Sequence, residues 1–337
     1  MPQMDAGRKL SGFARYAWFV LGYNVLVILW GVFLRASKSG DGCGQHWLTC
    51  HGEVVPSAPE LKTVIEFSHR ITSALDGLFV IALLVWAVII WKRARTPLSD
   101  QVMTTAIGSF IFVLIEGALG AGLVLTGNTA ETLTPARPFW MAAHLLNTLV
   151  LLTLLTMTAW SASSERLIRF RGDPGYAKWI AIGALLIFAV GITGSIAALS
   201  SMIFPSGTIT EGIAKDFSPT SHTLLRLRPL HPIIAVAAAV FLVFWTGWLK
   251  GKLVDNVVVT RWANVLAALT LAQLAFGALT LLTLGPILMQ LGHLLLADAV
   301  WIAFVLLSLN LLCSQEAVAH KPARHFSPAE TIASSES

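Results

Sequence analysis

Long apolar stretches, separated by short polar segments, dominate the pattern of the chain. Each is long enough, at roughly 20 residues, to cross a bilayer core of about 30 Å as an α-helix. We expect eight spans, at 15–34, 67–91, 101–126, 138–160, 177–203, 224–248, 261–284 and 287–312. The last two meet at Gly285-Pro286, a tight turn that divides an apolar run too long for one helix. Because the stretches lack the alternation of a barrel strand, the pattern predicts an all-α polytopic membrane protein.

Composition supports this interpretation. Of the 337 residues, 55% are hydrophobic and 12% are charged. A soluble domain has about a quarter of its residues charged, so this chain cannot cover a globule of its length with charge. A soluble enzyme, a disordered chain and a nucleic-acid binder are therefore excluded.

The distribution of positive charge predicts the orientation. Most of the 23 Lys and Arg residues fall on the side of the spans that holds both ends of the chain. The positive-inside rule places that side, and hence both termini, in the cytoplasm. The first span follows a short polar lead without a cleavable signal or a transit segment, which favours a bacterial plasma membrane. The segment 315–337 is rich in Ala, Ser, Pro and charge, and we expect a disordered cytoplasmic tail.

Two halves of the chain resemble each other weakly. Residues 117–120 (GALG) match 277–280 (GALT), and residues 140–146 match 289–295 around a shared His-Leu-Leu. A four-helix unit returns the chain to its starting side, so two copies would be related by a pseudo-twofold axis along the membrane normal. We therefore predict two four-helix halves, 1–160 and 161–314.

Four of the nine histidines lie in spans, one in every second span. They are His69, His144, His231 and His293, and each lies within about two turns of the outer end of its span. A lone histidine in a membrane helix is commonly a polar core residue, but four at one depth, two per half, indicate a site. Imidazoles from facing helices can hold a haem iron between them, whereas copper or zinc would need further ligands that the spans do not supply. We predict two haem sites, His69 with His144 and His231 with His293.

Haem propionates need cationic or hydrogen-bonding partners. The arginines that flank the outer helix ends are Arg35, Arg70, Arg137, Arg226 and Arg228. Arginine also snorkels at membrane edges without any ligand. Arg70 and Arg228 are the favoured propionate partners because they lie nearest to His69 and His231 in sequence.

Glu66 lies three residues before His69, on the same helix face and closer to the outside. A carboxylate beside a haem edge is suited to proton transfer, although its charge also simply favours a helix N-terminus. Arg228 takes the corresponding place before His231, which suggests one reactive and one electron-transfer site. Three further acidic residues in the spans are expected first as structural polar contacts and second as a proton path: Asp76, Glu116 and Asp298.

Two of the three cysteines, Cys43 and Cys50, lie in the first outer loop. Outside the cytoplasm such a pair can oxidise to a disulfide, and a metal site that uses His46 and His51 is the alternative. Cys313, at the inner end of the last span, is expected to be a packing thiol.

This set of residues resembles the haem A synthase family of cytochrome oxidase assembly. The resemblance covers all eight spans and rests on the run 30–37, the Cys43/Cys50 loop, the Glu66-Phe67-Ser68-His69-Arg70 element, the histidine of the fourth span, Leu230-His231-Pro232 and residues 293–298. One departure is that some bacterial relatives carry a second cysteine pair in the outer loop 204–222, and this chain has none there.

The resemblance implies oxidation of the ring-position-8 methyl group of haem O to a formyl group, through hydroxylation, to give haem A. It implies that His69 and His144 ligate the substrate haem in the N-terminal half, and that His231 and His293 ligate haem B in the C-terminal half. Glu66 matches an acidic residue implicated in catalysis, and Cys43 and Cys50 match an outer-loop disulfide.

The sequence also leads to expectations about binding partners and leaves two alternative functions open. The expected partners are the haem O-producing membrane enzyme, cytochrome oxidase assembly factors and the lipid bilayer, with no nucleic acid. One alternative is a di-haem b membrane subunit that transfers electrons and has no substrate of its own. Another is a haem carrier or assembly scaffold, which would load haem reversibly without changing it.

Overall fold

The computed structural model describes residues 2–129, 133–168 and 174–313, and within these ranges the chain is helical and holds no β-strand. Eight helices in this part of the chain are long and apolar enough to cross a membrane, which confirms the predicted fold class. They are α1 (Pro2–Ala36), α2 (Leu61–Arg93), α3 (Pro97–Leu125), α4 (Arg137–Ser164), α5 (Pro174–Ile203), α8 (Leu230–Lys252), α9 (Val257–Leu282) and α10 (Ile287–Leu312). Two short helices, α6 (Ile209–Phe217) and α7 (Thr223–Leu227), precede α8. The predicted tail 315–337 lies outside the described residues.

Local signals start several helices where the sequence changes character. Thr96 caps α3, because its hydroxyl accepts from the Ser99 N–H and the Ser99 hydroxyl accepts from the Thr96 N–H, with Pro97 next in the chain. The Asn256 side chain caps α9 by accepting from Val259 N–H at 3.1 Å. The expected turn between the last two spans is present, since α9 ends at Leu282 and Gly285 has a φ of 66°.

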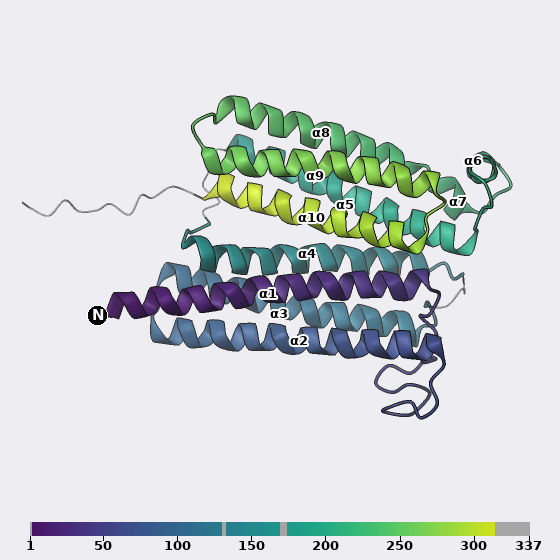
Figure 1. The fold of residues 1–337 in the computed structure, drawn as a ribbon, viewed down its shortest axis with the longest axis horizontal. Helices are drawn as coiled ribbons and strands as arrows, with labels where there is room; N and C mark the ends of the chain where they lie inside the picture. The colour runs from purple at the N-terminus through teal and green to yellow at the C-terminus, as the bar shows by residue number, and fades with distance from the viewer. Residues whose placement is uncertain (1, 130–132, 169–173, 314–337) are drawn as a thin grey trace, which may run out of the picture.

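The eight long helices pack as two groups of four (Figure 1). In the first group α1 contacts α2 and α4, and α3 lies between α2 and α4. In the second, α5 contacts α8 and α10, and α9 lies between α8 and α10. The order of contacts is therefore the same in both groups, with α5, α8, α9 and α10 in the places of α1 to α4.

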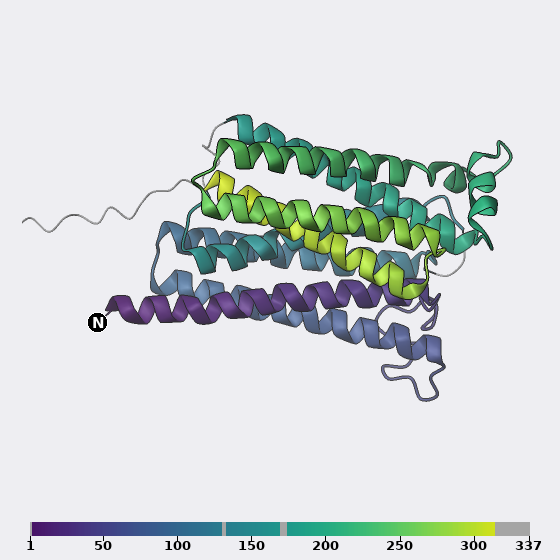
Figure 2. The same cartoon turned by 45° about the horizontal axis from the view of Figure 1, so that its top comes forward.

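The two groups meet along α4, which contacts both α5 and α10, and along α1, which contacts α10 (Figure 2). The indole N–H of Trp301 on α10 lies 2.8 Å from the carbonyl of Leu149 and 3.1 Å from the hydroxyl of Thr153, both on α4. A single cluster of buried apolar side chains runs through both groups and includes Leu152 of α4 and Phe304 of α10. The seam between the groups is thus part of one continuous core.

The α1–α2 connection and the α6–α7 segment lie at the same end of the bundle, which we call the loop end. The first turn of α1 and the last turn of α10 lie at the opposite end (Figure 1). As a result α2, α4, α8 and α10 all begin at the loop end. It corresponds to the side predicted to be outer, and the orientation in a membrane remains a prediction.

Candidate functional site

The four predicted haem ligands lie at similar depth below the loop end. His69, His144 and His293 follow the first residues of α2, α4 and α10 by eight, seven and six positions. His231 follows the first residue of the Thr223–Lys252 span by eight. At a rise of about 1.5 Å per residue, each ring lies within about 12 Å of the start of its span.

The rings of His231 and His293 face each other across the C-terminal group. Their centroids are 6.3 Å apart and their planes are perpendicular, at 88°. An imidazole nitrogen binds a metal at about 2 Å, so two rings on opposite sides of one iron have centroids roughly 6 Å apart. The separation therefore fits a single iron held between the two rings. In the N-terminal group, His69 and His144 lie close enough for their charges to interact.

Each of the four rings lies against a glycine of the neighbouring helix. A Cβ on that glycine would lie 3.1, 3.9, 3.0 or 2.9 Å from the nearest ring atom for the pairs Gly31–His69, Gly120–His144, Gly194–His231 and Gly277–His293. Three of these distances are shorter than ordinary van der Waals contact, so a side chain there would displace the ring. The glycines therefore let each imidazole pack directly against the backbone of the neighbouring helix.

Three of the four rings carry a buried nitrogen with no hydrogen-bond partner among the described residues: Nδ1 of His69, of His231 and of His293. Buried polar atoms without partners are uncommon in folded proteins, and where they occur they often mark a missing ligand. Together with the ring spacing and the glycines, this fits the predicted haem sites.

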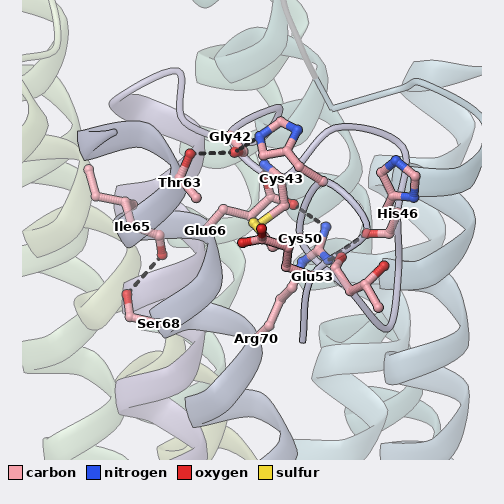
Figure 3. The surroundings of a disulfide bond; sticks show 12 residues. Gly42, Cys43, His46, Cys50, Glu53, Thr63, Ile65, Glu66, Ser68 and Arg70 are labelled. Carbon is pink, nitrogen blue, oxygen red and sulfur yellow. Dashed lines mark hydrogen bonds and ion pairs between the residues drawn. A yellow bond between two sulfur atoms is a disulfide. The ribbon is translucent and has the colours of Figure 1, made fainter. Parts of the chain in front are cut away.

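Glu66 is 3% exposed and is held by the first outer loop (Figure 3). Its Oε2 accepts a hydrogen bond of 2.8 Å from the backbone N–H of Cys43, and its Oε1 lies 2.5 Å from Nη2 of Arg70. Cys43 is joined to Cys50 by a disulfide with an S–S distance of 2.06 Å, which confirms the predicted pair. The carboxylate thus lies one helical turn from His69, fixed by a loop and by a cation.

Arg70, on α2, also binds the first outer loop. Its Nη1 donates to the carbonyls of His46, Trp47 and Thr49 at 2.5, 3.1 and 2.9 Å. The Thr63 hydroxyl adds a bond of 2.6 Å to the carbonyl of Gly42, where any Cβ would collide with the backbone of Lys62. In this structure the guanidinium of Arg70, the predicted propionate partner, is committed to Glu66 and the loop.

The alternative metal site in this loop finds no support in the geometry. Cys43 and Cys50 are bonded to each other, and Nε2 of His51 lies 2.8 Å from the carbonyl of Gly42. In the part of the chain that the structure describes, no group of three or more His, Cys, Asp and Glu side chains is placed to hold a metal ion.

Arg228 has a comparable role at the second outer segment. Its guanidinium pairs with Asp216 at 2.7 Å and donates to the carbonyl of Gly212 at 3.1 Å, which ties α6 to the start of α8. Elsewhere on α6, the Lys215 ammonium and the Gly207 N–H lower the pKa of the exposed Glu211 carboxyl. Arg228, like Arg70, would have to exchange these partners to bind a propionate.

Two other outer arginines lie near each other at the loop end of the N-terminal group. Arg35 ends α1 and Arg137 begins α4, and their charges are close enough to repel. Arg137 is 2% exposed, and its Nη2 donates to the carbonyl of Thr129 at 3.3 Å.

The three acidic residues inside the spans have different surroundings. Asp76 accepts from the Asn24 amide at 2.7 Å, whereas Oδ2 of the buried Asp298 has no partner among the described residues. Glu116 on α3 lies 2.8 Å from Nδ1 of His144. The expectation of a structural polar contact therefore describes Asp76, while Glu116 contacts a predicted ligand directly.

Sequence reasoning missed the four glycines and the contact of Glu116 with His144. The short-string match aligned Gly117 with Gly277, but the structure places Gly120, one turn further on, in the position of Gly277. A match of Glu116-x-x-x-Gly120-Ala121 with Gln273-x-x-x-Gly277-Ala278 would have given both the register and the polar neighbour of each histidine.

Comparison with known proteins gives a consistent family. The family described as "Cytochrome oxidase assembly protein" matches residues 14–305. Proteins named "Heme A synthase" from Symbiobacterium thermophilum and Alkalihalophilus pseudofirmus are 30% and 29% identical to this chain. These matches cover 82% and 83% of this chain and 88% and 90% of the two relatives.

A more similar relative is considerably longer than the chain. A protein of Thermus thermophilus named "Protoheme IX farnesyltransferase" is 41% identical over 302 residues, which are 90% of this chain and 49% of that protein. The chain thus spans about half the length of this relative.

Proposed function

Since the chain belongs to the haem A synthase family of cytochrome oxidase assembly proteins, we propose that it oxidises the ring-position-8 methyl group of haem O to a formyl group. The observation that carries this proposal is the Glu66 network, which puts a buried carboxylate one turn from His69 and holds it on both oxygens. An electron-transfer subunit would need the histidine pairs but not this carboxylate.

The N-terminal half, 1–160, would bind the substrate haem through His69 and His144. Gly31 and Gly120 would let the two rings pack against α1 and α3. Arg35 and Arg137 would face its propionates, and Arg70 would join them if it exchanged its present partners. The C-terminal half, 161–314, would bind haem B through His231 and His293. Haem B, when bound, supplies an iron that accepts and releases single electrons.

Glu66 would act as the proton acceptor for the substrate. Loss of two electrons and one proton from a methyl group conjugated with the macrocycle would leave a cationic carbon, with the electrons passing to an external one-electron oxidant. Addition of water to that carbon would release a second proton and give the hydroxymethyl group, and a second such oxidation would give the formyl group. The carboxylate would take the proton released by the water or stabilise the charge, while the disulfide loop over it limits access of bulk solvent.

We further propose that the protein lies in a bacterial plasma membrane with both termini in the cytoplasm. The Thermus relative named a protoheme IX farnesyltransferase suggests that this chain works beside an enzyme that farnesylates protohaem, the class of reaction that would supply haem O.

The test is the identity of the pigment. Protein purified from cells that make haem O should release haem B together with haem O, its hydroxylated form or haem A, as measured by mass spectrometry of the acid-acetone extract. Haem B alone, at two per chain, would favour a di-haem b subunit. Haem O bound reversibly and unchanged would favour a carrier.

A further inference from the structure

The carboxylate of Glu116 is surrounded by donors from one face of α4. Oε1 lies 2.8 Å from Nδ1 of His144, and Oε2 lies 2.5 Å from the amide nitrogen of Asn147. The Thr148 hydroxyl also bonds to the carboxylate. All three groups can donate a hydrogen, so both carboxylate oxygens act as acceptors.

This arrangement fixes the state of the His144 ring. With the hydrogen on Nδ1 and directed at Glu116, the lone pair of Nε2 is free to bind a metal. Nε2 is the ring atom nearest to Gly120 of α3, at 3.9 Å from the place of a Cβ on that glycine. Metal-binding histidines commonly donate their second N–H to a carboxylate, which orients the ring and raises its strength as a ligand.

The other half carries a neutral group in the same place. Gln273 on α9 precedes Gly277 by four residues, as Glu116 precedes Gly120, and each glycine lies against the histidine of the next helix. The Gln273 amide nitrogen lies 3.5 Å from Nε2 of His293, which is long for a hydrogen bond. The two positions correspond in sequence spacing, but Glu116 contacts Nδ1 of His144 with a carboxylate, whereas Gln273 presents a neutral amide to Nε2 of His293.

We infer that Glu116 is a positioning residue that lowers the reduction potential of the N-terminal haem. A carboxylate bonded to the ligand imidazole stabilises the additional positive charge of ferric iron, and the neutral Gln273 cannot do so. The lowered potential favours release of electrons from the N-terminal site. The inference rests on the proposed function for the identity of the two bound haems.

The test is redox titration of the purified, haem-loaded protein. The titration is monitored at the absorption bands that distinguish haem O or haem A from haem B. Glu116→Gln should raise the ferrous-to-ferric ratio of the N-terminal haem at fixed poise by about tenfold, which is about 59 mV for one electron. The C-terminal haem should not shift. A matched control is Asp76→Asn, which alters a buried carboxyl of the same half that is bonded to Asn24 rather than to a histidine, and it should shift the N-terminal potential less.

The reverse change gives a second measurement. Gln273→Glu should lower the potential of the C-terminal haem and leave the N-terminal haem unchanged. If Glu116→Gln loses its haem, two other variants are measured in its place. Thr148→Val keeps the carboxylate but removes one of its donors, and Gln273→Glu adds a carboxylate in the C-terminal half. Unchanged potentials in variants that retain both haems would overturn the inference. Shifted potentials in a protein that forms no formyl product would instead count against the proposed function alone.

Discussion

The backbone N–H of Cys43 donates a 2.8 Å hydrogen bond to the carboxylate of Glu66, so a cysteine of the outer-loop disulfide holds the proposed proton acceptor. The donor belongs to a loop and the acceptor to the second turn of α2. The position of the carboxylate therefore depends on the conformation of the loop, which the disulfide and Arg70 restrain together.

Replacing Glu66 by Gln should lower formyl product by about 10²-fold or more while both haems remain bound, because the amide can still accept from Cys43 but cannot take a proton. Product is measured by mass spectrometry of extracted pigments and haem content by absorption. Glu53→Gln, which alters an exposed loop carboxylate bonded to Ser57, is the control and should retain activity. Haem A formed by Glu66→Gln at the wild-type rate would remove Glu66 from the mechanism.

Removing the disulfide should loosen the loop above Glu66. We expect the double variant Cys43→Ser/Cys50→Ser to lose about 2 kcal/mol of stability, because the reduced unfolded chain is less constrained. Product formation should fall several-fold, since the Cys43 N–H no longer has a fixed position. Thermal unfolding in detergent and the product assay measure the two effects, with Cys313→Ser as a control that leaves the loop intact. Wild-type activity in the double variant would show that the loop does not position Glu66.

Adding a methyl group at Gly277 should impair haem binding in the C-terminal half. The new Cβ would lie 2.9 Å from the His293 ring, so the ring must move away from residue 277 and lose its present spacing from His231. We expect haem B affinity to fall by about tenfold, at the lower end of the effects of disturbing metal-ligand support. Gly117→Ala, where a Cβ meets nothing within 4 Å, is the matched control. Equal haem content in the two variants would contradict a role for the glycine.

The buried pair of Asn24 and Asp76 should stabilise the N-terminal group. Asn24→Leu removes the 2.7 Å hydrogen bond and leaves a buried carboxyl without it, at a cost of about 2 kcal/mol. Replacing both residues by Leu should restore much of the loss, because no polar group is then left buried. A thermal-unfolding double-mutant cycle measures this coupling, and strictly additive losses would show that the pair contributes nothing.

The sequence predicted the spans, the turn at Gly285 and the depth of the histidines because these depend on local composition and on helix length. Even the ion pair of Glu66 with Arg70 follows from their i,i+4 spacing. Helix α6 was missed because it is only nine residues long and lies in a polar loop between two long apolar spans, and its attachment through Arg228 to Asp216 is a tertiary contact.

The contacts of Arg70 were also beyond sequence reasoning. Nearness to His69 along the chain predicts a propionate partner, which stays a prediction, and it gives no sign of the three loop carbonyls that the fold brings to the guanidinium. Loop conformation of this kind depends on the disulfide and on close backbone approach at Gly42, and neither is visible in hydrophobic periodicity.

The seam along α4 has a consequence for how the molecule loses its structure. The apolar cluster extends from α1 and α2 through α4 into α8 and α10. Neither four-helix group therefore has a complete hydrophobic core of its own. Heating should therefore melt both repeats in one cooperative transition, and a fragment that ends after α4 would expose the surface that Trp301 covers.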